Sequence, residues 1–214
     1  MARPAPSELD EDTLQVPRAV KLPVELTPPE GFDPGEPATW PAVEGRLEWV
    51  AGRLLWMPPC ADVQQDTVTD VVVTIGLWGR DRPEFAIGTN EAGMRRGEDS
   101  RGADAAVWRR GELGGYRGKF RHLPPVLAVE VSGQDESEVV LREKAHWYLG
   151  AGVEVVWLVL TDERAVVVLT PAGECRLAAS DRIPEHPSLP GLAPHVADLF
   201  RQIGVRAPTP GGPR

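Results

Sequence analysis

Two acidic residues stand in segments that otherwise have the composition of buried strands: Asp104 in GADAAVW and Glu130 in LAVEVS. On a pleated strand, Glu130 shares a face with Ala128 and Ser132, while the aliphatic side chains take the other face. Burial of a carboxylate costs several kcal/mol unless a cation or strong hydrogen-bond donors accompany it. The two acids therefore indicate a polar site, unless both strands expose one face to water, as antiparallel strands often do.

A lysine borders the apolar face of the next predicted helix. Within residues 137–149, Lys144 lies three residues after Leu141 and four before Tyr148, a spacing that places side chains on one helix face. Its four-carbon stem can extend to water along the edge of the core, or it can cross the end of the sheet towards Glu130. The second route would bring a positive charge to the acids.

Two carboxylates and one lysine are groups that suit phosphodiester hydrolysis. The carboxylates can hold one or two divalent ions, which polarise the phosphate and lower the pKa of the attacking water. Hard oxygen ligands favour Mg²⁺ or Mn²⁺. An ammonium group can orient the water or stabilise negative charge in the transition state. Asp104, Glu130 and Lys144 are thus candidate catalytic residues, the two acids as metal ligands.

The elements that would position these residues alternate along the chain. Hydrophobic periodicity and turn signals predict two helices and a series of short strands. A hairpin around the Ala51-Gly52 turn comes first, within 46–58. The other predicted elements are a helix at 62–79, strands at 84–89, 103–108 and 125–132, a helix at 137–149, and strands at 154–160 and 164–170.

This order predicts an α/β fold with a mixed sheet flanked by helices. A right-handed crossover through the second helix would place strand 154–160 parallel to strand 125–132. The body of the protein is expected at 42–204. Residues 1–41 are rich in proline, which favours an extended arm rather than a helix or a central strand, and 205–214 are expected to form a disordered tail.

Composition narrows the class of protein. Hydrophobic residues make up 42% of the chain and charged residues 26%, as in ordinary globular proteins. Two cysteines cannot form a disulfide framework or a zinc ribbon, and the four histidines show no paired ligand spacing. The chain shows neither a signal peptide nor an apolar run long enough to cross a bilayer, so a cytoplasmic location is expected. The net charge of -9 argues against broad electrostatic binding of nucleic acid.

The order and spacing of several segments resemble the Uma-two family of endonucleases, within the PD-(D/E)xK superfamily. The resemblance covers about residues 44–203 and implies a restriction endonuclease-like core. The segments that carry it are RLEWVAGRLLWMPP, SRGADAAVW, LPPVLAVEVS and LREKAHWYLGAGVEVVWLVL, with LPGLAPHVADLF near the end.

The resemblance also assigns roles to single residues. Asp104 matches the motif aspartate and Glu130 the motif glutamate. Ser132 stands where the superfamily pattern has a lysine, and in this family the lysine lies on the following helix, where Lys144 matches it.

Two further positions bear on the resemblance. Glu48 matches an acidic position of the leading segment, which makes it an additional candidate site residue, although it can also be a solvated acid on the hairpin. Ala103 replaces the usual proline before the aspartate, and this change affects how the strand begins rather than the chemistry.

Two functions remain open at this point. The first is an endonuclease that hydrolyses phosphodiester bonds in DNA with Mg²⁺ or Mn²⁺. The second is a non-catalytic module that keeps the fold and assembles as a dimer or binds a partner. The Asp104, Glu130 and Lys144 set favours the first, and the acidic net charge favours the second. In either case the chain is expected to form a homo-oligomer. Its seven tryptophans are interpreted as packing residues, some of them at a dimer face.

Overall fold

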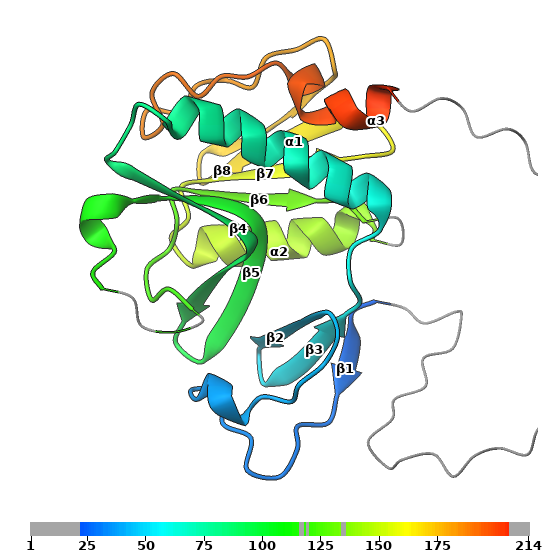
Figure 1. The fold of residues 1–214 in the computed structure, drawn as a ribbon, viewed down its shortest axis with the longest axis vertical. Helices are drawn as coiled ribbons and strands as arrows, with labels where there is room; N and C mark the ends of the chain where they lie inside the picture. The colour runs from blue at the N-terminus through cyan, green and yellow to red at the C-terminus, as the bar shows by residue number, and fades with distance from the viewer. Residues whose placement is uncertain (1–21, 116–117, 119, 134–135, 206–214) are drawn as a thin grey trace, which may run out of the picture.

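The structure is a computed structural model that describes residues 22–115, 118, 120–133 and 136–205. Residues 1–21 of the proline-rich segment and 206–214 of the predicted tail lie outside the described residues. The described chain forms an α/β fold in which one mixed sheet is flanked by helices (Figure 1). This architecture confirms the fold class that the sequence predicts.

Nine strands of the described residues form this sheet. Along the sheet their order is β1-β3-β2-β5-β6-β7-β8-β9, and β4 pairs with β5 outside this path. The strands are β1 (Val24–Leu26), β2 (Arg46–Val50), β3 (Arg53–Met57), β4 (Phe85–Arg96), β5 (Asp99–Arg109), β6 (Leu127–Val131), β7 (Val155–Leu160), β8 (Ala165–Thr170) and β9 (Gly173–Leu177).

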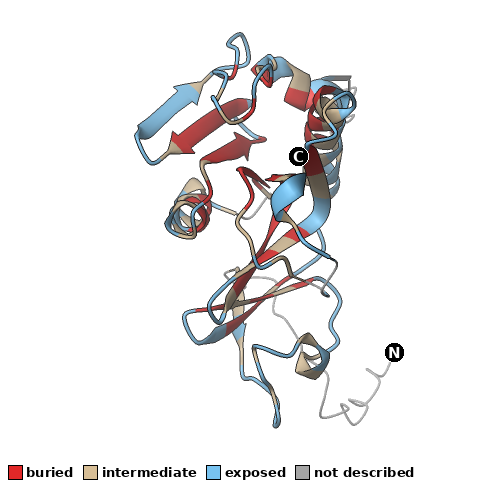
Figure 2. Ribbon diagram, turned by 90° about the vertical axis from the view of Figure 1, so that its left-hand side faces the viewer, coloured by how far each residue is buried: buried red, intermediate tan, exposed pale blue. Residues whose placement is uncertain are grey.

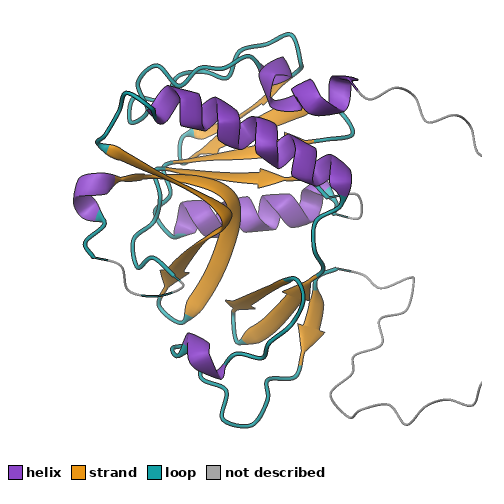
Figure 3. Cartoon of the chain, viewed as in Figure 1, coloured by secondary structure: helices purple, strands orange, loops and turns teal. Residues whose placement is uncertain are grey.

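The helices cover both faces of the central strands (Figures 1 and 3). On one face, α1 (Asp62–Gly79), the 3-10 helix η3 (Val196–Phe200) and α3 (Arg201–Val205) pack together, and Val71, Ile75 and Leu199 belong to the same buried cluster as Val129 and Trp157 of the sheet. On the other face lies α2 (Glu138–Gly150). Figure 2 shows that buried residues concentrate in the central strands. None of the described helices combines the length and apolar character needed to cross a membrane.

Helix α2 is the crossover that positions the candidate site. Its Leu141, Ala145 and Tyr148 pack against Ala128 of β6 and Leu158 of β7. Strands β6 and β7 pair in parallel on either side of this connection, as predicted. Because Glu130 shares a face of β6 with Ala128, its side chain points to the layer occupied by α2.

The sequence predicts β4 and β5 too short. Residues 90–102 are polar and contain several glycines, a composition typical of loops. In the structure, β4 and β5 form a long antiparallel hairpin through this region, with an irregularity between Thr89 and Ala92. Pairing persists there because the hairpin satisfies the backbone hydrogen bonds, while Met94 and Ala103 provide buried contacts.

Two edge strands also escape the sequence pattern. Strand β9 is largely exposed, so it shows no alternation of apolar and polar residues. Strand β1 lies within the proline-rich segment and pairs only with β3, at the sheet edge, where proline is tolerated. The described part of that segment contacts the body further on, since the ring of Phe32 lies 5.1 Å from that of Trp49.

Candidate active site

Asp104 and Glu130 lie on neighbouring antiparallel strands. In the β5–β6 ladder Ala105 pairs with Val129, so Asp104 and Glu130 stand opposite each other one position further along. Directly opposed residues project from the same face of a sheet. Both side chains are buried, with exposed fractions of 6% and 1%, so neither acid lies on a solvated strand face. The structure therefore brings together the two acids that the sequence selected.

Each carboxylate has a distinct set of partners. Asp104 Oδ2 accepts a hydrogen bond from the backbone N–H of Val131 at 2.7 Å. Glu130 Oε1 accepts one from the Tyr148 hydroxyl at 2.7 Å, and its Oε2 accepts one from Lys144 Nζ at 3.1 Å. Both donors to Glu130 come from α2 and are separated by one helical turn. Tyr148, which the sequence suggests only as a packing residue, is thus a polar partner of the site.

Lys144 is buried rather than extended to water. Its exposed fraction is 3%, and its ammonium contacts Glu130 and also Glu136, at 2.6 Å from Oε1. Burial lowers the pKa of Lys144, but the negative charges of Glu130 and Glu136 outweigh this and raise the pKa overall. Lys144 is therefore held as a cation inside the site.

Ser132 does not take the place of the missing motif lysine. Its hydroxyl lies 3.0 Å from that of Thr161 and accepts a hydrogen bond from the backbone N–H of Thr161 at 2.9 Å. These contacts join the ends of β6 and β7. Among the described residues, Lys144 is the only lysine, and its ammonium lies beside Glu130.

Glu48 is also buried, so it is not the solvated hairpin acid that the sequence left open as an alternative. Its exposed fraction is 1%. Its Oε2 accepts a hydrogen bond from Arg101 at 3.0 Å, its Oε1 accepts one from the backbone N–H of Gly102 at 3.3 Å, and Arg46 Nε lies 3.7 Å from Oε1. Both oxygens of Glu48 are therefore engaged by protein groups.

Arg46 is the site residue that the sequence did not select. It lies two positions before Glu48 on β2, and Nη1 of its guanidinium lies 3.9 Å from Asp104 Oδ1. The alternation Arg-Leu-Glu, with Arg46 and Glu48 on one face of a strand, is the signal that could have identified it. Burial lowers the pKa of Arg46, but the charges of Glu48, Glu130 and Asp104 raise it overall, so the guanidinium stays charged.

The two central acids differ in how far the protein compensates their charge. Burial raises the pKa of Asp104 to about 7, and the negative charge of Glu130 adds to this effect, against the opposing influence of Arg46. Burial also acts to raise the pKa of Glu130, but Lys144, Arg46 and the Tyr148 hydrogen bond lower it overall. Glu130 is thus satisfied by the protein, whereas Asp104 lacks sufficient positive charge.

The weak compensation of the Asp104 charge is consistent with a divalent cation as an additional partner of this carboxylate. Within the described ranges, no three or more histidine, cysteine or acidic side chains are grouped so that they could hold a metal by themselves. Mg²⁺ does not need such a cage, since it usually keeps several waters and binds through one or two carboxylates and substrate phosphates. Asp104 and Glu130 are the residues that would hold it.

Comparisons with known proteins agree with this fold. A family model described as "Putative restriction endonuclease" (Uma2) matches residues 37–199, which confirms the resemblance found in the sequence. No curated protein sequence matches the chain. A solved structure described as "a putative nuclease belonging to DUF820 from Anabaena variabilis" has the same fold, with a TM-score of 0.69 and 18% identity. The match covers 79% of this chain and 98% of that one.

Proposed function

We propose that this chain, which belongs to the family described as "Putative restriction endonuclease", is a metal-dependent endonuclease that hydrolyses phosphodiester bonds in DNA. The observation that carries the proposal is the contact between Lys144 and Glu130 beside Asp104, all three of them buried. Apolar residues of similar volume would stabilise the fold at least as well as this carboxylate pair and ammonium group, so the buried charges indicate a functional site.

Asp104 and Glu130 would hold the metal, with Mg²⁺ or Mn²⁺ as the ions that their oxygen ligands favour. The ion would supply Lewis-acid polarisation of the phosphate and a lowered pKa of the bound water. In the hydrolysis, the water oxygen forms a bond to phosphorus, the bond to the leaving oxygen breaks, and that oxygen takes up a proton.

The remaining residues of the site act on charge and position. Lys144 would stabilise the negative charge that grows on the phosphoryl oxygens, a preorganised role because its ammonium is already fixed by Glu130 and Glu136. Tyr148 holds Glu130 in one orientation through its hydroxyl. Glu48, whose oxygens accept hydrogen bonds from Arg101 and Gly102 and whose Oε1 lies 3.7 Å from Arg46, would position the two arginines.

Cleavage of supercoiled plasmid and of single-stranded DNA with Mg²⁺ or Mn²⁺ tests this function. Wild type is expected to nick or linearise the plasmid, whereas Asp104→Asn, which keeps the acceptor for the Val131 N–H, should lose this activity. EDTA should stop wild-type cleavage. Equal cleavage by wild type and Asp104→Asn would show that the activity does not arise at this site.

The acidic net charge of -9 favours a second candidate, a non-catalytic module that keeps the nuclease fold. The same experiment separates the two. A folded wild-type chain that cleaves neither DNA form with either metal would support the module and refute the endonuclease.

A further inference from the structure

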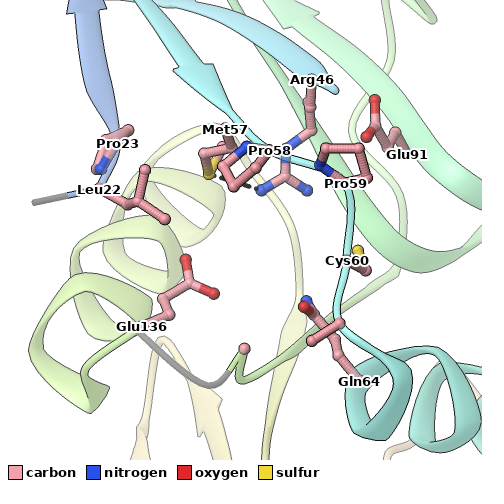
Figure 4. Close-up of a pocket in the computed structure, with 12 residues that line it drawn as sticks. Leu22, Pro23, Arg46, Met57, Pro58, Pro59, Cys60, Gln64, Glu91 and Glu136 are labelled. Carbon is pink, nitrogen blue, oxygen red and sulfur yellow. Dashed lines mark hydrogen bonds between the residues drawn. The ribbon is translucent and has the colours of Figure 1, made fainter. Parts of the chain in front are cut away.

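A small pocket opens beside the candidate active site. Its walls come from the end of β3 and the segment that follows it, from the start of α1, and from the segment before α2 (Figure 4). Arg46 points into this pocket, close to Met57, and Glu136 lies on the opposite wall. Arg46 thus connects the pocket to Asp104, since its Nη1 lies 3.9 Å from Asp104 Oδ1.

The guanidinium of Arg46 is buried but weakly satisfied. Its exposed fraction is 9%. Nη1 donates to the carbonyl oxygen of Gly102 at 3.4 Å and Nη2 to the sulfur of Met57 at 3.1 Å, a weak acceptor. Nε makes no hydrogen bond to any described residue and lies 3.7 Å from Glu48 Oε1, while Nη1 lies 3.9 Å from Asp104 Oδ1. A buried guanidinium in this state has donors left for an anion.

Arg101 provides the contrast. It is buried to the same degree and also pairs with Glu48, but at 3.0 Å through a direct hydrogen bond. Its guanidinium lies over the ring of Trp147, 5.5 Å from the centroid, and it lines a different pocket, beside Lys144. Its Nε, like that of Arg46, makes no hydrogen bond to a described residue. Arg101 thus differs from Arg46 in its direct pairing with Glu48 and in the pocket that it faces.

The backbone before Arg46 is built for close contact with the pocket wall. Gly45 has a φ of +101°, and a Cβ at this position would lie 2.2 Å from the carbonyl oxygen of Met57. Only glycine fits such a conformation and approach. The start of β2 and the end of β3 are thus held together, which fixes the direction in which Arg46 leaves the strand.

We propose that Arg46 binds a phosphate group of the DNA backbone in this pocket and so positions the strand for hydrolysis. The inference rests on the proposed endonuclease function. A planar guanidinium matches two phosphate oxygens with parallel hydrogen bonds. The pocket volume of about 130 Å³ is far below the roughly 300–1,000 Å³ of sites that enclose whole small molecules, so its size suits one phosphate group.

Two acids line the same pocket and limit what it can bind. Glu136 is paired with Lys144 at 2.6 Å, which neutralises its charge. Glu91 is exposed, so water and salt screen its charge. Arg46 therefore remains the charged donor of the pocket that is available to an anion.

The salt dependence of DNA binding tests the proposal without relying on cleavage. A short labelled duplex would be titrated by fluorescence anisotropy in EDTA at salt concentrations from about 50 to 200 mM. If Arg46 contacts a phosphate, Arg46→Gln should bind more weakly than wild type, and the slope of log K against log salt should shrink by about 1. Arg101→Gln, which also removes a partner of Glu48, should keep the wild-type slope.

Arg46→Lys covers the case in which Arg46→Gln does not fold. The lysine keeps the charge and hence the slope, but it should bind DNA more weakly than wild type because it cannot make two parallel hydrogen bonds. The proposal would be overturned if Arg46→Lys bound DNA with wild-type affinity or if folded Arg46→Gln kept the wild-type slope. It would also be overturned if Arg46→Gln and Arg101→Gln lost equal affinity and slope, or if wild type did not bind DNA.

DNA cleavage is measured separately, with the same protein preparations in buffer that contains Mg²⁺ and no EDTA. Cleavage by wild type without an Arg46-specific change in slope refutes the phosphate contact and leaves the endonuclease intact. An Arg46-specific change in slope without any cleavage supports the contact and refutes only the reaction.

Discussion

Two clusters of acids and bases lie on either side of α2, and their surroundings differ. The buried cluster joins Glu48, Asp104 and Glu130 to Arg46, Arg101 and Lys144, all with exposed fractions of 9% or less. The surface cluster joins α2 to β9 and to the turn between β7 and β8, through ion pairs of Arg142 with Glu138 and Glu174, and of Arg176 with Glu138 and Glu163. Its side chains have exposed fractions of 29–57%.

The comparison separates charges that stabilise a surface from charges that serve a site. Exposed pairs contribute little to stability, about 0–1 kcal/mol each, because water and salt screen them. Buried charges cost several kcal/mol in lost hydration, and a buried pair is often no more stable than apolar residues of the same volume. The buried cluster therefore needs a reason beyond folding, and binding of a metal and a phosphate provides one.

Among substitutions in the two clusters, removal of the Lys144 ammonium is expected to have the largest effect on DNA cleavage. Lys144→Met keeps the stem but removes the ammonium, and it should lower DNA cleavage by ~10²–10³-fold, the scale observed when one electrostatic stabiliser is lost. The variant should also be less stable, because Glu130 and Glu136 lose their cation.

Cleavage by Lys144→Met would be measured at a temperature well below its thermal midpoint, with circular dichroism to confirm folding. Wild-type cleavage by the folded variant would exclude Lys144 from the reaction.

Neutralisation of the two central acids, Asp104 and Glu130, should change the free energy of unfolding in opposite directions. Glu130 is well compensated, so Glu130→Gln should lower the free energy of unfolding by about 3 kcal/mol, as expected when one partner of a buried pair is lost. Asp104 is poorly compensated, so Asp104→Asn should raise the free energy of unfolding of the metal-free protein at pH 8, by an amount on the order of 2 kcal/mol.

The effect of Asp104→Asn should also depend on pH. The pKa of Asp104 is raised in the folded protein from its usual value of 3.8 to about 7. Between these values the folded chain binds a proton that the unfolded chain does not, so the free energy of unfolding falls as pH rises through this window. The gain from Asp104→Asn should therefore be smaller at pH 5 than at pH 8 in urea titrations. Equal gains at both pH values would contradict the raised pKa.

The sequence indicates in advance the two acids and the lysine that the structure brings together, because each departs from a regular apolar pattern. Asp104 and Glu130 interrupt buried strands, and Lys144 interrupts a helix face. The sequence does not predict the partners of these residues. Arg46 belongs to a short hairpin whose sequence does not indicate that it pairs with β5, as it does in the structure. Glu136 lies in the segment before α2, outside any periodic pattern. Such contacts depend on how the hairpin and the crossover are placed, which local periodicity does not encode.

The smallest effect is expected at the surface cluster. Arg176→Gln removes ion pairs with Glu138 and Glu163, and it should change the free energy of unfolding by about 1 kcal/mol or less, since these side chains are well exposed. Cleavage should be unchanged. Thermal unfolding at low and high salt provides the measurement, because any contribution of the cluster should fade as salt rises. A loss comparable to that of Glu130→Gln would show that burial does not distinguish the two clusters.

Calorimetric titration of the metal-free chain with Mn²⁺ tests the central claim most directly, since the proposed function assigns a divalent cation to Asp104. Wild type should bind Mn²⁺ with micromolar-to-millimolar affinity. Asp104→Asn should lose this binding, and Arg176→Gln should keep it. A folded wild-type chain that gives no binding heat, or an Asp104→Asn variant that binds Mn²⁺ as wild type does, would contradict the account.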